Sequence, residues 1–338
     1  MKLYKSASYD HFRCLAGACP DTCCQEWDIQ VDPKTAAYYN TIPGALGEKI
    51  RASLHIEDGE TIITLVDNHC PMQDPDGLCH IQAQLGEQAL CQVCREFPRL
   101  RHESGNFMEL GLELSCPEAA RILLQESYRL LNPVEAEGDT EPDYEEEAMD
   151  ILLSARQEAL NLLYDNRYSV GEALSLVFFY GIRTQGLLDG EDVPSFDAAV
   201  SLEAARNMQN PGDFRDICDF FLEMEILTPE WKQLLNRAKS APLSPYCRNL
   251  AACLIGRYWL QAVSDYDLYC RVKFILIACI LVSGLPGDFI WNAHLFSKEI
   301  ENDIDNVDAI LDGAYGDPMF TDDKLLSYLL KTGKNQTL

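Results

Sequence analysis

Apolar and polar positions follow a helical rhythm over the second part of the chain. From about residue 145 to 283, apolar residues recur three and four positions apart, and Gly or Pro interrupts the pattern between segments. This spacing predicts amphipathic α-helices. The predicted helices lie near residues 145–165, 169–188, 197–209, 213–225, 229–238, 245–263 and 268–283. No longer period repeats along them, so the pattern indicates an α-helical domain and not a solenoid.

The pattern before residue 130 is shorter and mixed. Segments 27–32 and 61–66 are rich in β-branched residues, which predicts short strands, and the stretch between them is largely helical from Pro33, directly after a capping aspartate. Alternating residues on both sides of a turn at 104–105 predict a hairpin, and an amphipathic helix follows from Cys116. The predicted fold class is therefore α+β, with a small N-terminal module before a mostly α-helical domain.

The longest apolar run, "FILIACILV" at 274–282, has nine residues. A helix needs roughly 20 apolar residues to cross a bilayer, so this run predicts a buried helix and no membrane partner. The first residues, "MKLYKSASYDHFRC", lack the apolar stretch of a secretory signal. We therefore expect a cytoplasmic protein.

Cysteines are concentrated in the N-terminal module. Nine of the fourteen lie within residues 14–116: Cys14, Cys19, Cys23, Cys24, Cys70, Cys79, Cys91, Cys94 and Cys116. Thiols stay reduced in the cytoplasm, and a chain of 338 residues can bury its cores without disulfides, so the concentration predicts a metal site or a catalytic site. The other five occur singly in apolar helical patterns, where cysteine behaves as a small hydrophobic residue: Cys218, Cys247, Cys253, Cys270 and Cys279.

A strongly acidic stretch follows the cysteine-rich part. Positions 134–150 hold nine acidic residues and no basic residue. Such a composition does not pack into a core, so it predicts a linker or a solvated helix start. The predicted division is a cysteine-rich metal-binding domain at 1–132, an acidic linker at 133–147 and an α-helical domain at 148–338.

The net charge excludes one class of partner. The chain has 54 acidic and 27 basic residues and a formal net charge of −27. No basic stripe is present that could neutralise phosphates, so we do not expect nucleic-acid binding. An acidic surface attracts cationic ligands and lysine-bearing segments, although it also serves simply to keep a protein in solution.

The cysteine spacing is typical of metal sites. Cys91 and Cys94 form a C-x2-C pair, in which one loop supplies two ligands. Neighbouring Cys23 and Cys24 point in different directions on an extended backbone, so they serve two roles or belong to two metals. Four thiolates suit structural zinc and a [4Fe–4S] cluster equally well. His69 and His80 flank two of the cysteines, and a mixed zinc site that includes them is a further alternative.

Three motifs together resemble a known family. "FRCLAGACPDTCCQEWDIQVD" (12–32), "CREFPR" (94–99) and "LELSCP" (112–117) are similar to the cysteine-rich zinc- or iron-chelating domain, and in particular to the flagellin lysine-N-methylases that carry it. The resemblance covers roughly residues 4–130. The resemblance implies that seven of the cysteines surround the metal cluster: Cys14, Cys19, Cys23, Cys24, Cys79, Cys94 and Cys116. Cys70 and Cys91 complete the candidate ligand set.

The resemblance implies a methyltransferase. Its members transfer methyl groups from S-adenosylmethionine to flagellin lysines with an iron–sulfur cluster present, so the resemblance implies these cofactors and flagellin as protein substrate. The sequence shows neither a glycine loop of the doubly wound donor fold nor the C-x3-C-x2-C signature of radical enzymes. "GLPG" (284–287) and "GAYG" (313–316) are predicted turns. The donor site and the catalytic residues are therefore left unassigned.

Two other functions fit the same residues. One is a non-enzymatic zinc- or iron-binding protein, in which metal stabilises the N-terminal module and the helical domain binds a protein partner. The other is delivery of iron or zinc, which needs labile ligands and a docking surface.

Overall fold

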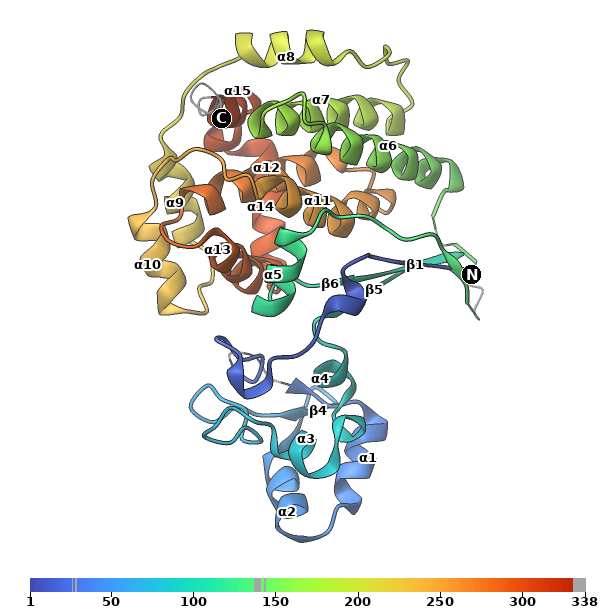
Figure 1. Ribbon diagram of the computed structural model, residues 1–338, viewed down its shortest axis with the longest axis vertical. Coiled ribbons are helices and arrows are strands. Elements are labelled where there is room, and N and C mark those ends of the chain that lie inside the picture. The colour runs from blue at the N-terminus through green and yellow to red at the C-terminus, as the bar shows by residue number, and fades with distance from the viewer. Residues whose placement is uncertain (26, 28, 137–140, 143, 331–338) are drawn as a thin grey trace.

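The computed structural model describes the chain except for residues 26, 28, 137–140, 143 and 331–338. Its buried apolar residues form two separate clusters. We refer to residues 14–96, which hold the smaller cluster, as the small lobe, and to the other described residues as the large lobe. In Figure 1 the small lobe lies below the helices of the large lobe, and the chain enters and leaves it beside strands β1 and β5.

The small lobe combines short helices with a three-stranded antiparallel sheet of order β2-β4-β3. Its elements are η2 (Ala16–Ala18), β2 (Ile29–Gln30), α1 (Pro33–Thr41), α2 (Gly44–Ser53), β3 (Leu54–Glu57), β4 (Glu60–Ile63), α3 (His80–Leu85), η3 (Glu87–Ala89) and α4 (Gln92–Glu96). The predicted start of α1 is confirmed, since Asp32 accepts a hydrogen bond from the Thr35 amide at 2.9 Å.

Strand β3 was absent from the sequence prediction. It pairs with β4 across a turn at Asp58 and Gly59, both with positive φ. An Asp-Gly pair is a strong signal for a two-residue hairpin turn, so this strand could have been found from the sequence. The strand predicted at 27–32 is confirmed only as the two residues of β2, and the structure describes neither residue 26 nor residue 28.

A second sheet, of order β5-β6-β1-β7, belongs to the large lobe. Its strands are β1 (Lys2–Lys5), β5 (Arg99–Ser104), β6 (Phe107–Leu112) and β7 (Val134–Glu135). The predicted hairpin is confirmed, because β5 and β6 pair antiparallel with Ser104 opposite Phe107. Strand β1 pairs parallel with β6, and Phe107 is buried in the larger cluster.

The large lobe is otherwise helical, with the predicted helical segments all present. Its helices are η1 (Tyr9–His11), α5 (Pro117–Gln125), α6 (Glu146–Tyr164), α7 (Val170–Leu188), α8 (Ala198–Asn207), α9 (Phe214–Leu222), α10 (Pro229–Arg237), α11 (Cys247–Tyr258), η4 (Trp259–Val263), α12 (Leu268–Gly284), α13 (Phe289–Phe296), the π-helical turn η5 (Ser297–Glu301), α14 (Ile304–Gly316), η6 (Pro318–Phe320) and α15 (Asp322–Leu330). Helix α7 begins with a reciprocal capping box between Ser169 and Glu172.

Helix α12 lies at the centre of the large lobe. Its apolar run at 274–282 is buried over its whole length, which confirms the predicted buried helix. Among the described helices, none is both long and apolar enough to span a bilayer.

The α+β class is confirmed, but the structure differs from the sequence prediction in detail. Helices α13, α14 and α15 follow residue 283, where no helix was predicted, and the predicted turn at 313–316 is the last turn of α14. The two hydrophobic clusters also divide the chain differently from the predicted domains. Residues such as Phe12 and Leu123, from the predicted domain 1–132, are buried in the larger cluster. Part of the predicted linker 133–147 lies outside the described residues.

Candidate functional site

The nine candidate ligands lie in the small lobe, except Cys116, which lies where the large lobe meets it. Their exposure differs: Cys70, Cys91 and Cys116 are buried, Cys19, Cys24, Cys79 and Cys94 are half-buried, and Cys14 and Cys23 are exposed. Two hydrogen bonds hold the loop at residues 14–24, which we call the cysteine loop; one joins it to the rest of the lobe and the other lies within it. The Cys70 amide donates to the Cys24 carbonyl at 2.7 Å, and the Cys19 thiol donates to the Asp21 carbonyl at 2.7 Å.

Five cysteines form one group, which we call the core thiols. They are Cys24, Cys70, Cys79, Cys91 and Cys94, and they are buried in or packed against the small-lobe cluster. Within this group the Cys91 and Cys94 thiols share a hydrogen bond, which lowers the pKa of Cys91 and raises that of Cys94. Burial raises the pKa of Cys70 to about 12. Once one of these thiols has ionised, its negative charge makes ionisation of a neighbouring thiol less favourable. A bound cation would offset this repulsion between thiolates.

Four cysteines form a second group, the junction thiols, where the lobes meet. They are Cys14, Cys19, Cys23 and Cys116. Cys116 occupies the N-cap position of α5 without a side-chain capping hydrogen bond. Burial raises its pKa to about 11, and the thiolate charges of Cys19 and Cys14 add to this effect. The hydrogen bond between Cys23 and Cys24 lowers the pKa of Cys24 to about 7. The adjacent pair thus contributes one thiol to each group.

The donor set fits a soft metal by its chemistry. Both groups consist of thiols, which are ligands for zinc and for iron–sulfur clusters. Within the part of the chain that the structure describes, however, no three His, Cys, Asp or Glu side chains are already arranged around one metal position. The geometry does not support a mixed zinc site that includes the two histidines. His69 Nδ1 lies 2.8 Å from the Asp67 carbonyl, and His80 is the first residue of α3. The metal site stays a prediction.

A buried ion cluster, which the sequence analysis missed, joins the cysteine loop to the large lobe. Asp21 Oδ2 lies 2.8 Å from His294 Nε2 on α13 and 2.8 Å from Lys298 Nζ on η5. Burial opposes ionisation of Asp21, but hydrogen bonds from His294 and Lys298 outweigh it and lower the pKa of Asp21. The only sequence signal was an aspartate within "PDTCC", because its partners are 273 and 277 positions away.

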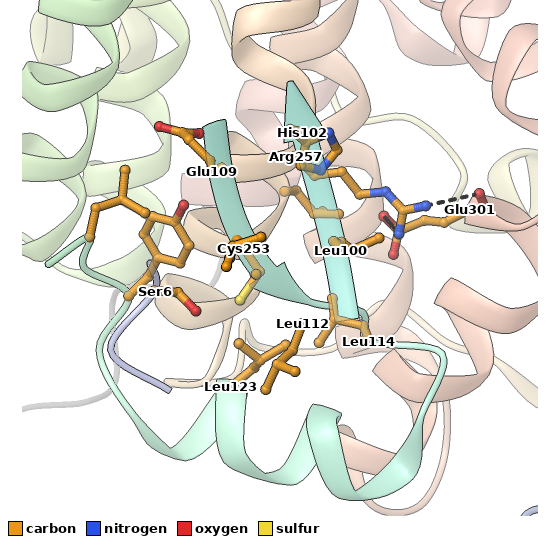
Figure 2. Close-up of a pocket in the computed structure, with 16 residues that line it drawn as sticks. Ser6, Leu100, His102, Glu109, Leu112, Leu114, Leu123, Cys253, Arg257 and Glu301 are labelled. Carbon is orange, nitrogen blue, oxygen red and sulfur yellow. Dashed lines mark hydrogen bonds and ion pairs between the residues drawn. The ribbon is translucent and has the colours of Figure 1, made fainter. Parts of the chain in front are cut away.

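The large lobe also contains a cavity of about 40 Å³ between the β5–β6 hairpin and α11, shown in Figure 2. Leucines line much of it, and its wall includes the charged side chains of Glu109, Arg257 and Glu301, whose partners Arg156 and Glu113 lie outside the lining. Arg156 forms a two-pronged ion pair with Glu109 at 2.8 and 2.5 Å. Arg257 lies 3.2 Å from Glu113 and 3.3 Å from Glu301.

The five scattered cysteines were predicted to be core residues. Cys218, Cys247, Cys270 and Cys279 are buried, which confirms the prediction for them. Cys253 is half-buried and lines the cavity, where burial and then the charge of Glu301 raise its pKa to about 12.

Comparison with known proteins gives relatives that share the family suggested by the cysteine motifs. The flagellar biosynthetic protein FliU of Salmonella muenchen is 33% identical over 123 residues, which cover 73% of that protein. The lysine-N-methylase of Salmonella choleraesuis strain SC-B67 is 31% identical over 167 residues. This chain belongs to the lysine-N-methylase family.

The family relationship covers part of each chain. The matches to the lysine-N-methylases of S. choleraesuis and of Salmonella typhimurium strain LT2, which is 32% identical over 161 residues, each span 45% of this chain and 38% of the relative. No family model matches the sequence, and no solved structure matches the chain.

Proposed function

We propose that this member of the lysine-N-methylase family is a protein-lysine methyltransferase that methylates flagellin. In this proposal S-adenosylmethionine supplies the methyl group, and the clustered cysteines hold a [4Fe–4S] cluster, with zinc as the alternative. The reaction takes place in the cytoplasm, before flagellin is exported. The names of the relatives carry the proposal, since two are lysine-N-methylases and a third is a flagellar biosynthetic protein.

The two thiol groups support the metal part of the proposal. The core thiols and the junction thiols bring nine cysteines from distant parts of the sequence into adjoining groups. Without a cation, most of these thiols resist ionisation because of burial and of their neighbours. A bound cluster would supply electron-transfer chemistry, and bound zinc would supply a structural cross-link.

The charge of the protein supports a lysine-rich substrate. A net charge of −27 attracts a basic protein face at a rate that falls with ionic strength. Lysine has an unperturbed pKa of about 10.4, so an enzyme that methylates it must first remove a proton from the ammonium group. A buried carboxylate is suited to that task.

The experiment is co-expression of flagellin with this protein, followed by mass spectrometry of the flagellin lysines. We expect methylated lysines with the wild-type protein and their loss with Cys94→Ala, which removes a core thiol. Cys218→Ala is the matched control, since Cys218 is buried in the larger cluster on α9, a helix that Figure 1 shows among the helices of the large lobe. Iron and zinc are counted per chain in all three proteins.

Two outcomes contradict the proposal. Unmodified lysines beside fully metal-loaded protein would refute the methyltransferase and favour a metal-binding protein that acts through a partner. Equal loss of metal in Cys94→Ala and Cys218→Ala would refute the assignment of metal binding to the clustered cysteines.

A further inference from the structure

The cavity in the large lobe holds buried polar atoms that the fold leaves without hydrogen bonds. Among the described residues these include Ser6 Oγ and His102 Nε2, and neither carboxylate oxygen of Glu301 has a hydrogen bond of normal geometry, although Arg257 and Tyr258 lie beside it. Ser6 is 2% exposed and Glu301 is 7% exposed. Proteins leave few such groups unsatisfied, because each costs about 1–3 kcal/mol. Several such atoms around one cavity indicate that the cavity binds a ligand that supplies hydrogen bonds to them.

Glu301 differs from a neighbouring carboxylate that the fold satisfies completely. Glu299, also buried, accepts hydrogen bonds from the Leu227 amide at 2.8 Å and the Thr228 amide at 2.9 Å, next to the start of α10. Glu301 ends the same π-helical turn, and its ion pair with Arg257 at 3.3 Å is longer than a normal charged hydrogen bond. Single π-helical turns occur frequently at functional sites.

One arginine beside the cavity is shared by two carboxylates, of which Glu113 lies outside the cavity wall and has its pKa raised by burial. Arg156 is matched by Glu109, whereas Arg257 alone faces both Glu113 and Glu301. Burial and the neighbouring Arg257 lower the pKa of His102, so this histidine does not supply the missing positive charge. Both Glu301 oxygens are acceptors, so the group that completes the cavity donates hydrogen bonds, and a cation donates the strongest ones to a carboxylate.

The size and walls of the cavity narrow the choice of cation. A volume of about 40 Å³ holds about three water-sized groups, which is enough for the end of a lysine side chain but not for S-adenosylmethionine. Leu100, Leu112 and Leu123 offer apolar walls for methylene groups. The Arg257 side chain, which lines the cavity, is 18% exposed, so one residue of the wall also contacts solvent.

We propose that the cavity binds the alkylammonium end of a lysine side chain, with the Glu301 carboxylate as its counter-ion and proton acceptor. The choice of lysine as ligand rests on the proposed function. In the proton transfer one N–H bond of the ammonium breaks and one O–H bond forms on Glu301, which leaves a neutral amine and a carboxylic acid. The amine then has the lone pair that a methyl acceptor needs.

The test measures binding, without any need for methyl transfer. The full-length protein, labelled with ¹⁵N, is titrated with n-butylammonium chloride and separately with n-butanol, a neutral probe of the same length. The amide signals of Gly111 and Gly256, which line the cavity, report occupancy. We expect n-butylammonium to bind about tenfold or more tightly than n-butanol, because a charged hydrogen bond contributes about 1.5–3 kcal/mol.

Two variants test the role of Glu301. Glu301→Gln is expected to weaken n-butylammonium binding by about tenfold while it leaves n-butanol binding unchanged, which also shows that the cavity is still folded. Asp308→Asn removes the same charge from an exposed position on α14 and is expected to change neither affinity. Equal affinity for both probes, no binding of n-butylammonium, or equal effects of the two variants would overturn the site.

The flagellin assay separates this site from the proposed function. If Glu301-dependent binding is found but wild-type protein does not methylate flagellin, the cation site stands and the proposed function fails. If Glu301→Gln methylates flagellin as fast as wild type does, the assignment of the acceptor site is overturned and the proposed function stands.

Discussion

The two lobes differ in what is available to stabilise them. The large lobe has helices of 19 residues, α6 and α7, and most of the largest fully buried side chains, among them Trp231 and Trp259. In the small lobe the longest helix, α2, has ten residues, and cysteines such as Cys70 and Cys91 make up part of a small cluster. Burial of apolar surface is the main contribution to the stability of a folded protein. The large lobe buries a large apolar core, whereas the small lobe buries only a small one.

The comparison indicates that the two lobes are stabilised in different ways. Thiols in a small core are poor substitutes for aliphatic side chains, but they become strong cross-links when they bind metal. If the proposed metal is bound, the small lobe depends on that ligand for order, whereas the large lobe depends on its packing. The ion cluster of Asp21, His294 and Lys298 connects the two.

Removal of metal is expected to have the largest effect and to act on one lobe. Structural zinc sites contribute on the order of 10 kcal/mol to folding, so stripping the metal with a chelator should expose the amides of residues 14–96 to hydrogen exchange. The amides of α6, α7 and α12 should keep their protection. Hydrogen-exchange mass spectrometry before and after chelation measures both. Equal loss of protection in the two lobes would refute the comparison.

Truncation in the large core is expected to have a smaller effect that does not depend on metal. Leu276 on α12 is fully buried, so Leu276→Ala should lower the free energy of unfolding of the large lobe by about 2–5 kcal/mol. The loss should be the same with and without chelator, as measured by denaturant unfolding followed by helix circular dichroism. A loss seen only in metal-loaded protein would mean that the two lobes unfold as one unit.

Acid is expected to have the smallest effect, at the connection between the lobes. The pKa of Asp21 is lowered in the folded protein, so its contribution to stability is present above the unfolded value of about 3.9 and is lost as pH falls through the lowered folded value. Between about pH 5 and pH 3, hydrogen exchange of residues 14–24 should therefore increase. Asp21→Asn should lack this part of the pH dependence, and an identical profile in both proteins would contradict the role of Asp21.

Local patterns in the sequence were sufficient for the helices from α6 to α12 and for the concentration of cysteines, but not for α13, α14 and α15. Three-and-four spacing identifies α6 to α12, because a helix that packs on one face carries its apolar residues at that period. The hairpin of β5 and β6 is equally local, and its turn at 105–106 lies one residue after the predicted position. Cysteine density, which is a property of composition, is also what predicts a metal site in the small lobe, and that site stays a prediction.

Other features depend on contacts between distant parts of the chain, and only the tertiary structure decided them. Strand β1 joins β6 about one hundred residues later, which places the first residues of the chain in the large core. Asp21 meets Lys298, and Arg257 lies between Glu113 and Glu301, across separations that no periodicity encodes. The sequence gives the same residue type whether a carboxylate lies in solvent or in a cavity. It therefore shows the charge of the residue but not its burial. Burial and partners decide whether a carboxylate is ordinary, like Asp308, or can serve a ligand, like Glu301.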